Sequence, residues 1–138
     1  MRKFLLNKLV RDGVVPDMEA KGQQVVHRRL DNLSFYRETG RKVMEETAEL
    51  DPTATRDKIV TELADRKEAL LTADEADKDL MAELGIAPEE VEAARLKRRE
   101  ERGGFDERMY VESVTLADDD PWAAYYAKEP DRFKEIPE

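Results

Sequence analysis

Three long segments of the chain are predicted to be helices, two from apolar side chains at helical spacing and the third from its start and stop signals. The first begins at Asp31 or Asn32, either of which is a good N-cap, and runs to about Leu50, where the sequence Asp-Pro-Thr ends it. The second covers about residues 55–73. The third begins at Pro88, a residue favoured in the first helical turn, and ends at a glycine pair. These segments predict a mainly α protein.

The stretches between these helices carry weaker signals. Within residues 1–23 the pattern predicts one short helix. Residues 24–30 and 109–116 are rich in β-branched side chains, which favour strands. We expect these two segments to pair as a small β-ribbon.

The end of the chain differs in composition from the rest. From Asp118 onward it combines acidic residues with prolines and clustered aromatic rings. A total of 138 residues suits one domain with a modest core. We therefore expect a single helical domain over residues 1–117, followed by a tail over residues 118–138 that is disordered or packs on a partner.

Charge and composition exclude several classes of protein. The formal net charge is −9, whereas proteins that wrap nucleic acid present a basic face. The chain has no cysteine, which excludes disulfides and thiolate metal sites. The apolar run at the N-terminus is too short for a signal peptide, and no stretch has the apolar length of a membrane span. We expect a cytoplasmic protein that binds neither nucleic acid nor a membrane.

Five carboxylates gather on two neighbouring helical segments: Glu45, Glu46, Glu49, Glu62 and Asp65. The three glutamates of the first segment fall within one arc of about 100° on their helix, and Lys42 lies in the same arc. Like-charge neighbours on a helix cost only about 0.2–0.5 kcal/mol per pair, so a solvated surface accounts for the cluster. Carboxylate oxygens are also the ligands that Mg²⁺ prefers, together with water and substrate phosphate. Periodicity leaves both interpretations open.

Four motifs follow one another along roughly residues 7–110. They are Asn-Lys-Leu-Val-Arg-Asp at 7–12, Glu-Glu-x-x-Glu at 45–49, Glu-Leu-Ala-Asp at 62–65 and Lys-Arg-x-x-x-Arg-Gly-Gly-Phe at 97–105. In this order they resemble the MazG-like superfamily of all-α nucleoside triphosphate pyrophosphohydrolases, and in particular a short branch related to phosphoribosyl-ATP pyrophosphohydrolase. The resemblance implies an antiparallel helix bundle of that type.

The resemblance also implies a metal site and a hydrolytic reaction. The family binds Mg²⁺ with the carboxylates of its two acidic motifs, which correspond here to Glu45, Glu46, Glu49, Glu62 and Asp65; Mn²⁺ is the alternative ion. It cleaves a nucleoside triphosphate between the α- and β-phosphates, giving a monophosphate and pyrophosphate. Mg²⁺ lowers the pKa of a bound water, and a glutamate then takes the proton. We assign that role to Glu45 or Glu46, and the motifs do not choose between them.

A triphosphate also requires cations from the protein. Lys8 and Arg11 lie three residues apart in the first motif, and Lys97, Arg98 and Arg102 lie at the end of the third helical segment. Arg grips phosphate oxygens in a bidentate way, while Lys acts as a point charge. We expect all five to bind substrate phosphate. The last three have a second interpretation, as complements of the helix dipole and partners of neighbouring glutamates.

The resemblance favours a house-cleaning enzyme that removes unwanted nucleoside triphosphates. The alternatives are hydrolysis of phosphoribosyl-ATP, and a non-catalytic protein that senses nucleotides or binds partners through its helices. Relatives build their sites in dimers or tetramers, so we expect a homodimer or homotetramer. Relatives usually carry apolar residues after the second acidic motif, whereas this chain has Arg66 and Lys67. Either the stem of Lys67 still packs while its ammonium reaches solvent, or the contacts of this helix differ from those in the relatives.

Overall fold

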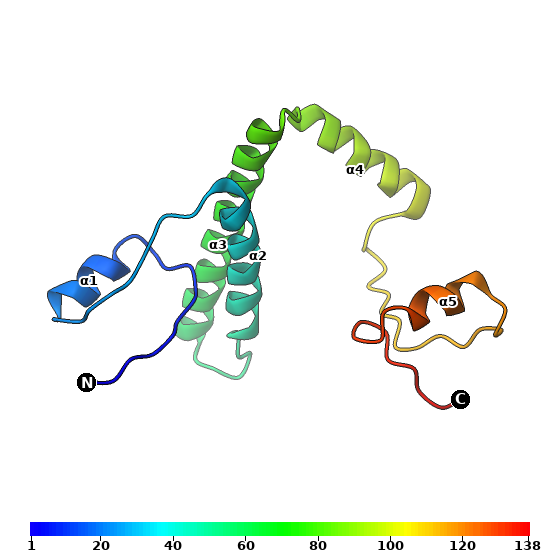
Figure 1. Cartoon of the computed structure of the whole chain (residues 1–138), viewed down its shortest axis with the longest axis horizontal. Helices are drawn as coiled ribbons and strands as arrows, with labels where there is room; N and C mark the ends of the chain where they lie inside the picture. Colours follow the sequence, from blue (N-terminus) through cyan, green and yellow to red (C-terminus); the bar gives the residue numbers. More distant parts are fainter. The chain divides into compact units, whose positions relative to one another are not determined.

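A computed structural model describes all 138 residues, and the chain is mainly helical with no strands (Figure 1). The helices are α1 (Val14–Ala20), α2 (Asn32–Ala48), α3 (Arg56–Leu84), α4 (Pro88–Arg102) and α5 (Pro121–Ala127). The chain divides into two compact units, Met1–Lys97 and Arg98–Glu138, and each is described by itself. The mainly α class predicted from the sequence is confirmed.

The starts of α2 and α4 are as the sequence predicts, and α3 has a cap that the sequence analysis did not name. The backbone N–H of Ser34 donates to Oδ1 of Asp31 at 2.8 Å, and this bond holds the pKa of the Asp31 carboxyl below its ordinary value. Thr55 caps α3 by accepting from the backbone N–H of Lys58. Pro88 opens α4, and Gly103, with a φ of 80°, follows its end.

Helix α3 is longer than the sequence indicates, because it continues from the predicted end near residue 73 to Leu84. The added stretch contains many charged residues, but it has no proline or glycine and is rich in Ala, Leu, Met, Glu and Lys, which are strong helix formers. Gly85 ends the helix in the left-handed conformation, with a φ of 68°. That conformation is costly for any residue with a Cβ, so the stop signal is the glycine and not the run of charges.

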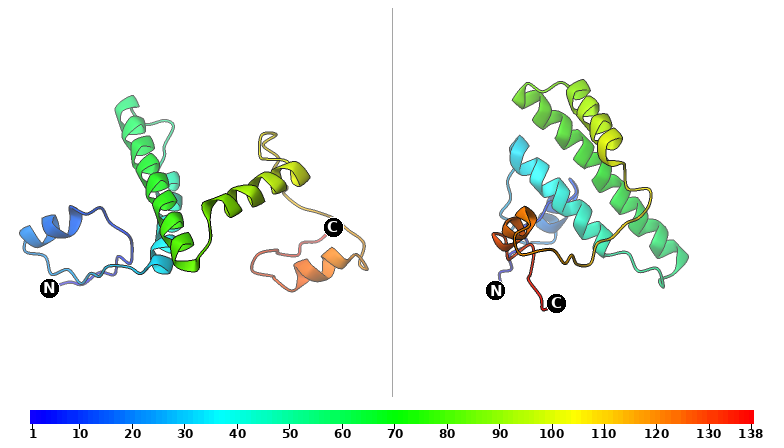
Figure 2. Two further views of the ribbon diagram at one scale, coloured as in Figure 1. Left: turned by 90° about the horizontal axis from the view of Figure 1, so that it is seen from above. Right: turned by 90° about the vertical axis from the view of Figure 1, so that its right-hand side faces the viewer.

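Helices α2 and α3 form an antiparallel hairpin and lie side by side in every view (Figure 2). Their contact is made through small residues: Thr39 of α2 is 2% exposed, and Ala69 and Ala76 of α3 are 7% and 0% exposed. Small side chains let two helix backbones approach closely along the seam. The buried core of the first unit is this seam, and many large apolar side chains on both helices remain outside it.

The predicted β-ribbon is wrong. Neither residues 24–30 nor residues 109–116 form a strand. The alternation of side chains in the first segment is imperfect, and its Val26 is exposed, as are Met109 and Val111 of the second. A two-stranded ribbon without an apolar face to bury is marginal in water, so β-propensity alone does not form one.

The second unit contains a short helix within the segment that the sequence predicts to be a tail. Asp120 caps α5 by accepting from the backbone N–H of Trp122 at 2.9 Å. The Trp122 and Tyr125 rings meet edge to face with centroids 5.3 Å apart, and Tyr126 contacts Phe133 at 4.9 Å. Aromatic pairs in such geometries stabilise one another, so the rings hold this segment together.

Candidate functional site

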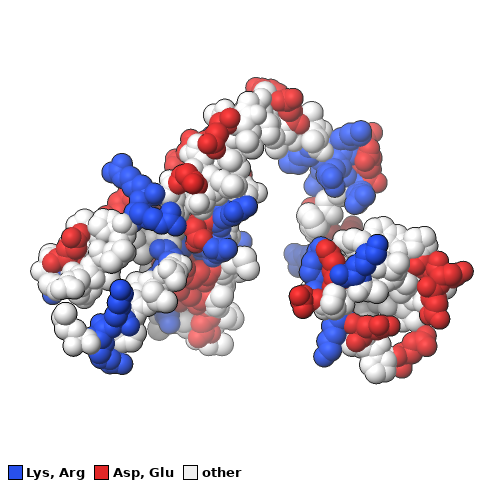
Figure 3. All heavy atoms as spheres, in the orientation of Figure 1, with Lys and Arg blue, Asp and Glu red and all other residues white.

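Basic and acidic side chains lie next to one another over the helical hairpin of the first unit (Figure 3). The carboxylates of the two acidic motifs are among them, three on α2 and two on α3. They are described one helix at a time, followed by the cations that reach them.

On α2, Glu46 is the most buried of the three glutamates, with 8% of the residue exposed. Lys42 lies between two of them, because its Nζ is 3.4 Å from Oε1 of Glu46 and 3.5 Å from Oε1 of Glu45. Glu49 lies one turn further along. The negative charge of Glu46 is the main cause that raises the pKa of the Glu49 carboxyl above its ordinary value, with desolvation second. The α2 glutamates are therefore crowded enough to repel one another.

On α3, Glu62 also lies close to the seam, with 12% of its side chain exposed. Its Oε2 accepts from the backbone N–H of Asp51 at 3.3 Å, and its Oε1 is 3.8 Å from Nζ of Lys58. One turn later, the Nε of Arg66 donates to Oγ1 of Thr47 at 2.9 Å. This bond crosses between the two acidic motifs, and it places them beside each other on the hairpin.

The N-terminal motif reaches both helices. Nζ of Lys8 is 3.4 Å from Oε1 of Glu45 on α2, and Nη2 of Arg11 donates to Oδ1 of Asp65 on α3 at 2.9 Å. These contacts join residues 37 and 54 positions apart in the sequence. The structure thus brings three of the four motifs together, with two predicted phosphate-binding cations against two predicted metal ligands.

The fourth motif is divided between the units. Lys97 is the last residue of the first unit, whereas Arg98 and Arg102 belong to the second. In the second unit, Nη2 of Arg99 donates to Oδ2 of Asp106 at 2.8 Å, and the Arg99 guanidinium lies against Gly104. The candidate site is therefore built from Lys8, Arg11 and the five carboxylates of the hairpin.

The donor set suits Mg²⁺ in kind, because it consists of carboxylate oxygens that already crowd one another. In the present arrangement, lysine or arginine side chains form ion pairs with four of the five carboxylates, all except Glu49. No three acidic or histidine side chains form a group that could hold a metal ion. A metal site here requires the carboxylates to turn away from these cations.

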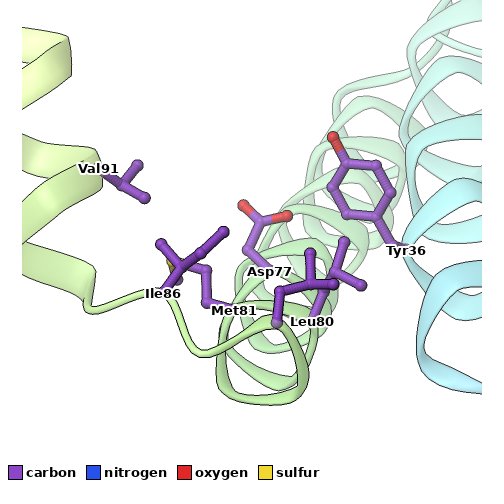
Figure 4. A pocket seen from close by; sticks show the side chains of 7 residues that line it. Tyr36, Asp77, Leu80, Met81, Ile86 and Val91 are labelled. Carbon is purple, nitrogen blue, oxygen red and sulfur yellow. The ribbon is translucent and has the colours of Figure 1, made fainter.

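Sequence reasoning missed a cavity on the same hairpin (Figure 4). It has a volume of about 260 Å³ and is lined by Tyr36 of α2 and by Asp77, Leu80, Met81, Leu84, Ile86 and Val91. Burial is the main cause that raises the pKa of the Asp77 carboxyl, and the charge of Asp74 adds to it. The signal that would have revealed the cavity is the continuation of α3 past residue 73.

The cavity and the carboxylates lie at different levels along the hairpin. Tyr36 and Glu45 are nine residues apart on α2, which is about 13 Å along the helix axis. On α3, Asp77 of the cavity follows Asp65 by twelve residues, or about 18 Å. The cavity therefore does not extend the carboxylate cluster, and it needs a separate explanation.

Comparison of the chain with protein-family models, with curated proteins and with solved structures finds no match in any of the three. None of the helices combines the length and the apolar character needed to cross a membrane.

Proposed function

We propose that the chain is a nucleotide pyrophosphohydrolase that uses Mg²⁺, with Mn²⁺ as the alternative ion, to hydrolyse a nucleoside triphosphate between the α- and β-phosphates. The observation that carries this proposal is the contact of Lys8 with Glu45 and of Arg11 with Asp65. Three motifs that resemble those of the MazG-like superfamily meet at one place, although long stretches of chain separate them.

The ion pairs suggest how substrate binding prepares the site. Lys8 and Arg11 are partly exposed, at 46% and 61% of their side chains, so a phosphate group from solvent can reach them. Phosphate competes with carboxylate for both cations, and Arg binds it through two parallel hydrogen bonds. When the cations move to phosphate, Glu45 and Asp65 are released, and with Glu46, Glu49 and Glu62 they become available to a divalent ion.

Each step of the reaction then falls to a group of the proposed site. A bound Mg²⁺ neutralises phosphate charge and makes a water more acidic. Glu45 or Glu46 takes the proton of that water while the water oxygen forms its bond to phosphorus. The bond between that phosphorus and the bridging oxygen breaks, and the bridging oxygen leaves with its electron pair. Lys8 and Arg11 stabilise the charge on the departing phosphate.

A non-catalytic role is the second candidate, and the ion-paired state of the carboxylates favours it. Ion pairs of Lys8 with Glu45 and of Arg11 with Asp65 can simply hold the N-terminal segment on the hairpin. Such a protein would act through its exposed helix faces. It would release no pyrophosphate under any metal condition.

The test is release of pyrophosphate from standard and modified nucleoside triphosphates and from phosphoribosyl-ATP, with Mg²⁺, with Mn²⁺ and with EDTA. Glu46→Gln keeps the shape of the side chain and removes its charge. We expect it to lower the rate by about 10²–10⁴-fold, the usual contribution of a general base. Glu83→Gln, an exposed carboxylate near the other end of α3, is the matched control. Release that needs no metal, or equal rates in the two variants, would contradict the proposal.

A further inference from the structure

The cavity on the hairpin combines an apolar lining with a single carboxylate, and no step of the proposed hydrolysis uses it. Its walls come from α2, from the end of α3 and from the beginning of α4, all within the first unit. Leu84, Ile86 and Val91 of the lining are 61%, 38% and 48% exposed, so the chain leaves this apolar surface in contact with water. A concave apolar surface with one placed charge is typical of a ligand site.

Asp77 is the charged group of the cavity, and it has no partner within the chain. It forms no ion pair and accepts no hydrogen bond; burial raises the pKa of its carboxyl, and the only charge that adds to this shift is another carboxylate, Asp74. The Asp77 carboxylate lies between Tyr36 and Ile86 (Figure 4). The Tyr36 hydroxyl is not used either, because Thr39 donates to the backbone oxygen of Tyr36 and not to its side chain. Two polar groups on different helices are therefore available to a ligand.

The charges around the cavity favour a positively charged ligand. Its lining contains no lysine, arginine or histidine. The last turn of α3 has no basic residue, and the first turn of α4 has Glu89 and Glu90. The C-terminal end of a helix also carries a partial negative charge, which stabilises cations near it. A cation is therefore attracted to this end of α3, whereas a phosphate is repelled.

The volume of the cavity limits the ligand to a small molecule. The cavity measures about 260 Å³, whereas sites for drug-sized ligands measure about 300–1,000 Å³. A dry apolar cavity of about 150 Å³ holds one benzene molecule. A ring with a short side chain therefore fits the cavity, and a nucleoside triphosphate fits neither its size nor its charge.

We propose that this cavity binds a small organic cation, with a protonated amine that pairs with Asp77 and an apolar body that packs against Leu84 and Val91. An alkyl amine is protonated at pH 7, as the side chain of lysine is. Its ammonium donates a charge-assisted hydrogen bond to the Asp77 carboxylate, and the Tyr36 hydroxyl offers a second acceptor. The apolar body removes the exposed lining from water. This site does not rest on the proposed hydrolytic activity.

A titration with three probes of similar shape tests the chemical class of the ligand. The probes are 2-phenylethylamine, 2-phenylethanol and phenylacetate, which share a phenyl ring on a short chain and differ in charge. Nuclear magnetic resonance of the isotope-labelled full chain follows each backbone amide. We expect the amine to bind with a Kd of about 1 mM, as a ligand of this size can, about tenfold more tightly than the alcohol, and phenylacetate to bind least. Equal affinity for all three, or no binding of the amine, would overturn the proposal.

A pair of matched variants tests the role of Asp77. Asp77→Asn keeps the shape of the side chain and removes its charge, so it should weaken binding of the amine by about tenfold and leave that of the alcohol unchanged. Asp79→Asn removes the same charge, but position 79 lies about 200° around α3 from position 77 and does not line the cavity. It should leave both affinities unchanged. An equal loss in the two variants would indicate a general attraction to the acidic chain and contradict the pairing with Asp77.

A larger side chain in the lining tests the apolar half of the site. Val91→Phe should occupy the space of the ring and weaken binding of the amine and the alcohol alike. Val91 is 48% exposed, so the chain should tolerate the change and fold normally. Val60→Phe, at a 52% exposed position of α3 outside the cavity, is the matched control and should leave binding unchanged. If Val91→Phe bound the amine as tightly as the unmodified chain does, the ligand would lie elsewhere and the proposal would be wrong.

Discussion

Replacement of Ala76 by leucine should separate the two helices of the hairpin and destabilise the protein. Ala76 has no solvent-exposed surface, and α2 is the element that packs against α3. Leucine adds three carbon atoms at a seam otherwise made of Thr39 and Ala69. These atoms have no space unless the helix backbones move apart, and such overpacking typically costs about 1–3 kcal/mol.

The expected change in melting temperature follows from the size of the first unit, residues 1–97. In a domain of this size, each kcal/mol lowers the melting temperature by about 4–8 °C. A cost of about 2 kcal/mol should therefore lower it by about 8–16 °C. Circular dichroism of the helical signal during heating measures this, at one fixed protein concentration because association adds stability.

Ala82→Leu is the matched control, since Ala82 lies on the same helix but is exposed. It makes the same chemical change without overpacking, and exposed substitutions usually alter stability by less than about 0.5 kcal/mol. If both variants melted within about 2 °C of the unmodified chain, the seam would not be tightly packed, and the reasoning from burial would fail.

Three further predictions concern the ends and charges of the hairpin. Gly85→Ala forces a residue with a Cβ into the left-handed conformation and should cost about 1–2 kcal/mol in the free energy of unfolding, measured with urea. Gly13→Ala is the control, because Gly13 has a negative φ and open space around it; equal costs would refute the argument. Glu49→Gln should raise the melting temperature at about pH 7, because it removes a negative charge that Glu46 repels. The pKa of Glu49 is raised in the folded state, so folding is favoured by protonation of Glu49 below its ordinary pKa of 4.5 and loses this contribution as the pH rises. Below about pH 4 Glu49 is protonated, and the variant should lose its advantage. Equal effects at both pH values would refute that sign. Arg11→Ala should lower kcat/KM for pyrophosphate release by about tenfold or more, through a higher KM. Initial rates over a range of substrate concentrations measure both quantities, and an unchanged KM would show that Arg11 does not bind the phosphate.

Helix ends that are set by residues next to them in the sequence could be predicted from the sequence. Asp31 caps α2, Pro88 opens α4 and Gly103 follows its end, all as the pattern indicates. Each of these signals acts within one turn of the backbone, so it does not depend on tertiary contacts. The end of α3 differs from the predicted one because apolar spacing fades after residue 73, whereas most residues of 74–84 are good helix formers that continue the helix.

Contacts between distant segments could not be predicted in the same way. Periodicity places Glu45 and Asp65 on their helices, but the reach of Lys8 and Arg11 depends on the path of a non-helical segment. The motif order suggested that these residues belong together, without giving their partners. The β-ribbon failed for a related reason: propensity favoured strands, but the apolar side chains of Val26, Met109 and Val111 pack against no other element and stay exposed.

The connection between α2 and α3 has only seven residues, 49–55, and Asp51 stabilises it by accepting from both the backbone N–H and the hydroxyl of Thr53. Loops of this length close in about 10–100 ns, and helical structures with local contacts fold within microseconds to milliseconds. The hairpin should therefore be among the first structures to form. Refolding after dilution from denaturant should show a fast phase whose rate is independent of protein concentration.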